Sequence, residues 1–360
     1  MKIVSLTLTG NNTDLIEAAL VSVADWVDAC IVIDTGVTDE SLAIASAVAG
    51  DKYVERKFEW VADFAAARNF SLEVAKEISA DWAIILDTDE RIHPQIDNIR
   101  GAIDSLVGDV FLVYHTNKTY CKEKLFRIPT TGKYIGATHE YFDCGSGIRT
   151  FLEAIAFSEV PKTAAATLAK FNRDLAILDR LVKEEPTNTR WLFYLGETLK
   201  KLGNNQQAII AYRDCANLNG WDEEAAWACY REAECWLALA DYQEAINACA
   251  KGLTKHAGIA ELAWLAAYAS YYAGLNAQAI HWAHLSIAMG KHQGYGKAIE
   301  RIGFQDPEAQ YEKPYDVLKY ALLRKGDAEG AKLAEQLYQN ACERRLRHLG
   351  NNSIERNYLI

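Results

Sequence analysis

Apolar and polar positions in the first part of the chain follow the pattern of a parallel α/β sheet. Short apolar runs rich in Ile, Val and Leu have the length of strands buried on both faces. They predict strands at residues 3–8, 30–33, 52–58 and 82–86. The segments between them place apolar residues at helical spacing and predict helices at 14–23, 41–49 and 63–79. Strands that alternate with helices in this way are typical of a parallel sheet covered by helices.

The strand at 82–86 is followed at once by three acids, Asp87, Asp89 and Glu90. Open α/β sheets bind ligands at the carboxyl ends of their strands. Clustered carboxylates there suit a hard divalent cation that carries substrate phosphates. A strand that ends in an acidic surface turn would have the same composition, so the three acids alone do not identify a site.

Beyond these acids the alternation of strands and helices stops. Strands are predicted at 110–115, 124–128 and 134–142, with a turn at 130–133. The last of these strands would carry His139 and Glu140 side by side. After residue 160 the pattern is helical throughout, beginning with a helix at 167–185 that ends before Pro186.

The helical part contains a repeat that begins near residue 188 and ends near 345. Its small and large positions match the tetratricopeptide unit, whose length is about 34 residues. One small position recurs at Ala208, Ala245, Ala279 and Ala331, with spacings of 37, 34 and 52 residues. The last spacing predicts an inserted loop near 291–311. Helix pairs of this kind stack into a solenoid with a concave face.

Aromatic residues in the repeats recur at helical spacing, which favours a role in the core over a ligand-binding box. They are Trp227, Tyr230, Trp236, Trp264, Tyr268, Tyr271, Tyr272 and Trp282.

Length and charge indicate two domains, 1–160 and 161–360, because 360 residues exceed the usual single core. Residues 1–160 carry 14 Lys and Arg against 25 Asp and Glu, whereas the remainder carries 24 of each sign. An acidic first domain argues against non-specific nucleic-acid binding, which depends on cations that neutralise phosphates. The dense basic cluster at 344–348 is assigned to a solvated helix end.

The eight cysteines include no Cys-x-x-Cys pair, and several fall at apolar helix positions. This usage favours free thiols in a reducing compartment over disulfides or zinc. The N-terminus alternates like a strand and lacks the apolar core of a signal peptide. The longest apolar stretch, 262–275, is too short to span a bilayer. We therefore expect a cytoplasmic protein.

Four motifs then occur in order: Asp34–Asp39, Phe64–Asn69, Leu86–Glu90 and Gly136–Glu140. Together they resemble the pattern of the family-2 glycosyltransferases of the GT-A fold, in the branch with a C-terminal tetratricopeptide domain. The likeness continues at 191–195 and 220–224 and so covers most of the chain. It implies a GT-A (Rossmann-like) nucleotide-sugar domain followed by a tetratricopeptide-like α-solenoid.

The resemblance also implies site residues and a cofactor. A Mn²⁺ or Mg²⁺ ion would neutralise the leaving diphosphate of a nucleoside diphosphate sugar, with UDP-sugar as the expected donor. Asp89 would ligate the ion, His139 would complete its shell, and Asp87 would hold the ribose or a metal-bound water. The nucleotide-sugar-binding set is Thr9, Asp34, Asp39, Arg68 and Asp87.

Three of these assignments have alternatives. An inverting mechanism needs a carboxylate base, and Glu140 is favoured over Glu90 because the base must face the acceptor. Asp39 considered alone is better explained as a helix cap. Arg68 suits a diphosphate, although an ion pair with Asp63 or Glu73 would also explain it.

The sequence departs from the family pattern at Val37, where Ser is usual, and at Gly10–Thr13, where Lys-Asn-Glu-Glu is usual. Both lie at the nucleotide end. A tetratricopeptide adaptor with a catalytically weak first domain is therefore the alternative function. A nucleotidyltransferase is disfavoured because the N-terminus has no Gly-rich phosphate loop with a Lys.

The acceptor is left open by the sequence. The helical domain would recruit a peptide or protein acceptor, or would make a homodimer. A glycan and a modified nucleic-acid base are the other acceptors considered, and acidity makes nucleic acid the least favoured. No membrane span is expected.

Overall fold

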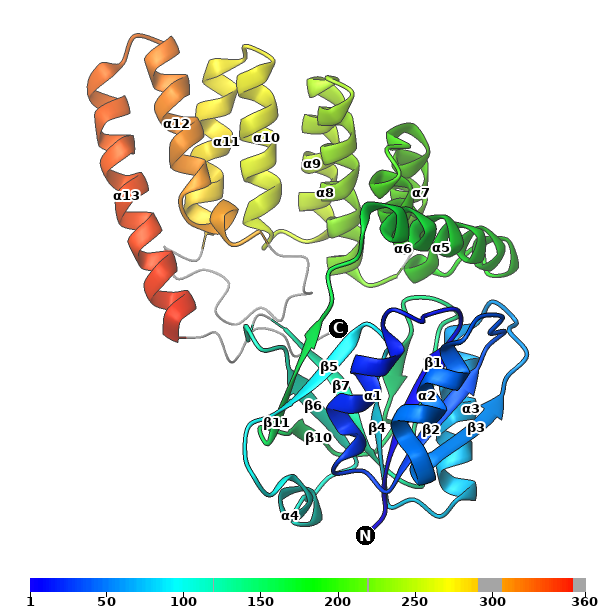
Figure 1. Cartoon of the computed structure of the whole chain (residues 1–360). Helices are drawn as coiled ribbons and strands as arrows, with labels where there is room; N and C mark the ends of the chain where they lie inside the picture. Colours follow the sequence, from blue (N-terminus) through cyan, green and yellow to red (C-terminus); the bar gives the residue numbers. More distant parts are fainter. Residues whose placement is uncertain (119, 219, 291–305, 352–360) are drawn as a thin grey trace. The chain divides into compact units, whose positions relative to one another are not determined.

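The computed structural model describes residues 1–118, 120–218, 220–290 and 306–351, with side chains to 348. The chain divides into two compact units, Met1–Ala166 and the residues from Thr167 onward. Figure 1 colours the first unit from blue to green and the second from green to red. Each unit is described by itself.

The first unit is built on a seven-stranded sheet with the order β10-β6-β7-β4-β1-β2-β3. β7 runs antiparallel to its neighbours β4 and β6, and the other adjacent pairs are parallel. The parallel pairs confirm the sheet that the alternation predicts, the whole is Rossmann-like as the resemblance implies, and the antiparallel β7 makes the sheet mixed. The strands are β1 (Ile3–Thr9), β2 (Ala29–Asp34), β3 (Tyr53–Lys57), β4 (Trp82–Ile85), β6 (Val110–Tyr114), β7 (Cys121–Arg127) and β10 (Arg149–Phe151).

Both faces of the sheet are covered by helices, and alternate strand residues divide between two apolar cores. In β4, Trp82 and Ile84 belong to the core that contains residues of α1 (Ile16–Ala24) and α2 (Ser41–Ala49). Ala83 and Ile85 belong to the opposite core, with α3 (Phe64–Glu77). The strand is therefore apolar on both faces because each face meets a different helix layer.

Two small antiparallel sheets and a short helix complete the unit. β5 (Glu90–Pro94) pairs with β11 (Ile155–Glu159), and β8 (Lys133–Ile135) pairs with β9 (Tyr141–Asp143). No sequence pattern predicts β5, β10, β11 or the helix α4 (Ile99–Asp104). These are short elements, and the pairing of β5 with β11 joins segments that lie far apart along the chain.

The single strand expected at 134–142 is wrong. The segment forms β8 and β9, separated by an irregular loop. Gly136 and His139 have φ angles of +103° and +50°, which an extended strand does not allow. His139 and Glu140 therefore lie in the loop between the strands.

The second unit consists of antiparallel helix pairs, as the repeat predicts (Figure 1). A long helix, α5 (Ala164–Glu184), leads into them. The pairs are α6 (Thr189–Lys201) with α7 (Asn205–Asn217), α8 (Asp222–Ala238) with α9 (Tyr242–Lys255), α10 (Ala260–Tyr272) with α11 (Asn276–Met289), and α12 (Lys313–Arg324) with α13 (Ala328–Asn351). The recurring Ala208, Ala245, Ala279 and Ala331 are all buried and lie on the second helix of each pair. The tetratricopeptide-like architecture is confirmed.

Most of the repeat aromatics are buried or half-buried. Trp227 and Tyr230 are fully enclosed, whereas Tyr272 is 51% exposed, so the repeat aromatics lie mostly, but not all, in the core, as predicted. Most of the insertion expected near 291–311 lies outside the described residues, because the description stops at 290 and resumes at 306. All eight cysteines are free thiols. Among the described helices, none combines the length and the hydropathy that crossing a bilayer requires.

The α6–α7 contact gives a test of the helical packing. A Cβ added at Gly196 would lie 2.5 Å from Cε1 of Tyr212, whose buried ring is held by a hydrogen bond from its hydroxyl to Glu197. We expect Gly196→Ala to destabilise the helical unit by about 1–3 kcal/mol, because the ring must move. Thermal unfolding followed by circular dichroism measures the shift. The exposed Lys201→Ala on the same helix is the control, and equal transition temperatures for the two variants would contradict the packing.

Candidate functional site

The acidic turn begins where β4 ends, at the carboxyl edge of the sheet. The Leu86 amide donates to the Leu6 carbonyl of β1, and the Glu90 amide donates to the Asp87 carbonyl at 2.9 Å. The three acids differ in exposure: the side chains of Asp87 and Asp89 are 29% and 18% exposed, whereas that of Glu90 is fully buried. Two of the acids are therefore half-buried at the end of the strand, and the third lies in the interior.

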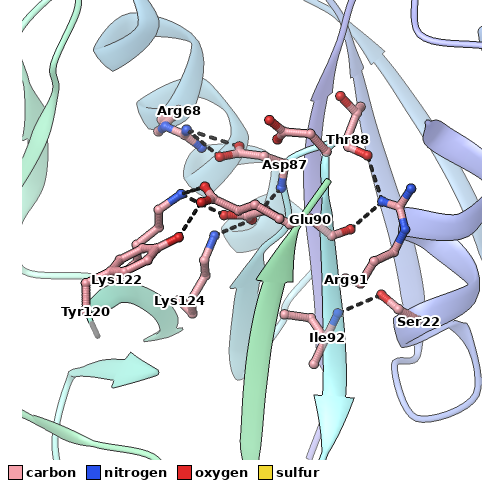
Figure 2. Close-up of polar contacts among 12 residues, drawn as sticks. Ser22, Arg68, Asp87, Thr88, Glu90, Arg91, Ile92, Tyr120, Lys122 and Lys124 are labelled. Atoms are coloured by element: carbon pink, nitrogen blue, oxygen red, sulfur yellow. Dashed lines mark hydrogen bonds and ion pairs between the residues drawn. The ribbon is translucent and has the colours of Figure 1, made fainter. Parts of the chain in front are cut away.

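Arg68, in the second turn of α3, joins two of the predicted motifs. Its Nη2 lies 3.1 Å from Asp87 Oδ1, and its Nε donates to Glu140 Oε1 at 2.7 Å. Figure 2 shows the guanidinium turned toward Asp87. The alternative pairing with Asp63 or Glu73 is wrong, because Asp63 caps α3 and Glu73 pairs with Lys76.

This pairing controls the ionisation of Asp87. Burial by itself raises the pKa of a carboxyl group. The Arg68 guanidinium, aided by Lys124 and Lys122, outweighs burial and holds the pKa of Asp87 well below its usual range. Burial likewise opposes the charge of Arg68, but Asp87 and Glu140 raise the pKa of its guanidinium. Both partners are ionised at neutral pH.

Asn69, the residue after Arg68, anchors the loop that carries the other motif. Its side chain accepts from the Tyr134 amide at 2.8 Å and donates to the Tyr134 carbonyl at 2.9 Å. The Phe64 amide at the start of α3 donates to the Ala137 carbonyl. α3 therefore positions both the arginine and the loop containing His139 and Glu140.

The loops after β1 and β2, where the sequence predicts the nucleotide to bind, lie at the same edge of the sheet. Asp34 Oδ1 accepts from the amides of Gly36 and Val37, at 2.8 and 2.7 Å. Thr9 accepts at its carbonyl from the amide and the hydroxyl of Thr35. These bonds fix Asp34 and Thr9 at neighbouring strand ends.

Asp39 lies just before α2 and accepts from the Ser41 amide at 2.9 Å. The cap residue of α2 is Glu40, so Asp39 orders the turn one residue before the helix and is not itself the cap.

The expected metal-ligand set, Asp87, Asp89 and His139, is not preassembled. In the part of the chain that the structure describes, no three His, Cys, Asp or Glu side chains converge as they would around a metal ion. Asp87 is engaged by Arg68, and Asp89 forms an ion pair with Lys162. The two carboxylates are oxygen donors of the kind that Mg²⁺ and Mn²⁺ use, but the three residues together do not form a closed site here.

Sequence reasoning missed the charged residues beneath the acidic turn. Lys124 on β7 is only 2% exposed and pairs with Glu90, and Lys122 binds the other oxygen of Glu90 at 3.0 Å. A signal was present, because a Lys inside a strand of a sheet covered on both faces needs a buried acidic partner.

Comparisons with known proteins bear on both units. Residues 7–149 match the model of the family described as Glycosyl transferase family 2. The SPbeta prophage-derived glycosyltransferase SunS of Bacillus subtilis (strain 168) is 25% identical over 219 residues, which cover 55% of this chain and 49% of that protein. The TPR repeat-containing protein Synpcc7942_0270 of Synechococcus elongatus is 40% identical over 82 residues, 23% of this chain and 19% of that protein. The chain thus spans about half or less of the length of these relatives.

Among solved structures, the crystal structure of MamA is similar over 52% of this chain and 99% of that chain, with 17% identity and a TM-score of 0.41.

The lowered pKa of Asp87 predicts a specific acid sensitivity. A carboxylate whose pKa is depressed by folding contributes stability above its ordinary pKa near 4, and that stability is lost as the pH falls toward the folded pKa. We therefore expect the difference in unfolding free energy between the wild type and Asp87→Asn to shrink by about 1 kcal/mol between pH 5 and pH 3. Denaturant unfolding of the first unit at the two pH values measures it. A difference that stays constant with pH would contradict the ion pair with Arg68.

Proposed function

We propose that this chain, whose residues 7–149 form a glycosyl transferase family 2 domain, moves a sugar from a nucleoside diphosphate sugar to an acceptor hydroxyl or thiol. The donor is a UDP-sugar, the reaction inverts the anomeric centre, and it takes place in the cytoplasm. The observation that carries the proposal is the bridge that Arg68 makes between Asp87 and Glu140. It gathers a diphosphate-binding cation, a nucleotide-site acid and a candidate base at the ligand-binding edge of the sheet.

The donor nucleotide is assigned to the loops after β1 and β2. A carboxylate fixed by two backbone amides, as Asp34 is, presents one orientation to a nucleobase donor group. Thr9 lies beside it, and Asp39 orders the turn before the helix that follows. Asp87 would hold the ribose, and the adjacent guanidinium of Arg68 suits the diphosphate.

A divalent cation, Mn²⁺ or Mg²⁺, would neutralise the leaving diphosphate as a Lewis acid when bound. Asp89 and Asp87 are the residues that would hold it, with His139 as the proposed third ligand. The left-handed backbone of His139, with φ +50°, supports a functional role, because strained residues cluster at functional sites.

The base is assigned to Glu140. Glu90 is fully buried, and its carboxylate accepts from the Asp87 amide and from two lysines. A carboxylate enclosed in this way cannot reach an acceptor. Glu140 is 16% exposed and lies beside Arg68. In the proposed step Glu140 takes the acceptor proton, the acceptor atom bonds to the anomeric carbon, and the nucleoside diphosphate leaves with the electron pair of the broken bond.

The departures from the family pattern do not remove contacts that the site uses. Val37 contributes its backbone amide to Asp34, which any residue other than Pro would supply. The Asn12 amide donates to the Ser41 hydroxyl and ties the loop after β1 to the start of α2. Both loops are therefore ordered despite the unusual side chains, which favours an enzyme over a degenerate adaptor.

The helical unit is proposed to recruit the acceptor, and we favour a peptide or protein because tetratricopeptide solenoids present an extended concave face. Dimerisation is the other role assigned to it. A glycan acceptor is compatible with the same site chemistry.

Substitution of Asp89 tests the function. We expect Asp89→Asn to lower the metal-dependent hydrolysis of the preferred sugar nucleotide by about 100-fold or more. Asp89 would hold the cation that stabilises the charge of the transition state, and the loss of one stabilising group of this kind costs this much. A panel of UDP-, GDP- and dTDP-sugars with excess Mn²⁺ identifies the donor and measures the rate. The exposed Asp97→Asn is the matched control. Unchanged turnover in Asp89→Asn would exclude the assignment, and the absence of heat in calorimetry with every nucleoside diphosphate would favour the adaptor.

A second substitution tests the base. Glu140→Gln keeps an oxygen for Arg68 but cannot take a proton. We expect donor hydrolysis by water to fall about 100-fold, as is typical for the loss of a general base. Azide is a nucleophile that needs no deprotonation, so its addition should restore turnover in Glu140→Gln far more than in the wild type. Equal effects of azide on the two proteins would argue against Glu140.

A further inference from the structure

The acidic turn rests on a buried charged group that the proposed reaction does not use. Glu90 Oε2 accepts from the Asp87 amide at 2.9 Å and from Lys124, and Oε1 accepts from Lys122 at 3.0 Å. Figure 2 shows both lysines reaching Glu90 from the side opposite Arg91. Glu90 therefore contacts the backbone of Asp87, whereas Arg68 contacts the Asp87 side chain.

Two reciprocal hydrogen bonds join Asp87 and Glu90, the first and last residues of the turn. The Glu90 amide donates to the Asp87 carbonyl, and the Glu90 carboxylate accepts from the Asp87 amide, each at 2.9 Å. This reciprocal arrangement resembles a helix capping box, in which two backbone donors at a chain reversal are satisfied together. It restricts the backbone from Asp87 to Glu90, the segment that carries Asp89.

The lysines are held by the surrounding elements. Lys124 lies on β7, which is hydrogen-bonded to β4 and β6, and its Nζ is 5.3 Å from the ring centroid of Phe157. Lys122 bridges from Glu90 to Glu159 at 2.5 Å, and Glu159 also accepts from the Tyr120 hydroxyl. Glu159 and Glu90 are directly paired in the β5–β11 sheet. The position of Glu90 is thus set by strands on two sides.

A contribution to folding stability does not by itself explain the buried ion pair between Glu90 and Lys124. Desolvation offsets most of the attraction within a buried ion pair, and apolar replacements of similar volume are often tolerated. A charged pair that also holds a backbone amide supplies orientation, which apolar side chains cannot do.

We propose that Glu90 is a positioning residue for the transfer reaction: held between Lys124 and Lys122, its carboxylate fixes the Asp87 amide and so the acidic turn against the diphosphate. This inference rests on the proposed function. Glu90 positions the turn, the two lysines hold Glu90, and none of the three contacts the substrate.

Two double variants that differ by one hydrogen-bond acceptor test the proposal. Lys124→Met with Glu90→Gln removes the buried charges but keeps an oxygen for the Asp87 amide. Lys124→Met with Glu90→Met removes that oxygen as well. In both variants Lys122 keeps Glu159 as its partner. The matched volumes make the two proteins comparable in fold, which thermal unfolding checks.

Two readouts are compared. Hydrogen exchange of the peptide spanning 86–90 should be faster in the Met variant than in the wild type, and close to the wild-type rate in the Gln variant. Donor hydrolysis should fall about 10- to 100-fold in the Met variant, as is common for loss of a supporting residue, and only a few-fold in the Gln variant.

If the Met variant is unfolded at the assay temperature, Glu90→Asp replaces it, because the shorter side chain withdraws the acceptor while keeping the charge for Lys124.

The outcomes separate this inference from the proposed function. If the two double variants have the same hydrogen-exchange rate and the same rate of donor hydrolysis, the positioning role is wrong, even when the wild type is active. A wild type that hydrolyses no donor would overturn the proposed function, and hydrogen exchange would still report whether Glu90 orders the turn. Faster exchange with reduced hydrolysis in the Met variant alone supports both.

Discussion

The site of the first unit depends on one cation. Arg68 forms ion pairs with both the acidic turn after β4 and the loop between β8 and β9, and so links the two segments. Its guanidinium keeps the Asp87 carboxylate ionised and holds Glu140 near it, and its position on α3 is fixed because the next residue, Asn69, clamps the backbone of β8. The short sequence Arg68-Asn69 therefore carries two separate tasks: the arginine gathers the acids, and the asparagine places the loop that supplies one of them.

Much of this fold could be predicted because its signals are local. The apolar run at 82–86 forms a strand because both of its faces meet helices, and the recurring alanines of the repeats are buried because helix pairs approach closely there. The expected strand at 134–142 is wrong because the backbone angles of Gly136 and His139 override an apolar pattern that looks extended. The pairing of β5 with β11 joins segments more than sixty residues apart, and no local pattern encodes such a register.

The sequence named the residues of the candidate site but not the contacts that the structure gives them. The resemblance of four ordered motifs to the family pattern named Asp34, Asp87 and Glu140 as candidates, and the topology places Asp34 and Asp87 at one edge of the sheet. The partners of Arg68 and the buried role of Glu90 could not be read in the same way, because each depends on side chains from other strands and loops. Glu90 illustrates the limit: its place beside Asp87 and Asp89 gives it the composition of a site acid, yet Lys122 and Lys124 on β7 make it part of the interior.

The charges at this edge of the sheet determine whether the proposed donor must bring positive charge with it. Asp87 and Asp89 each have a cationic partner already, Arg68 and Lys162, and the two lysines beneath the turn are engaged by Glu90. A diphosphate placed against two ionised carboxylates would meet like charge at close range, which is unfavourable unless compensated. Arg68 or Lys162 would have to turn from carboxylate to phosphate, or further positive charge would have to arrive with the donor. A turn whose backbone is fixed but whose two half-buried carboxylates can exchange partners meets this requirement. It is consistent with the proposal that the donor binds together with a divalent cation.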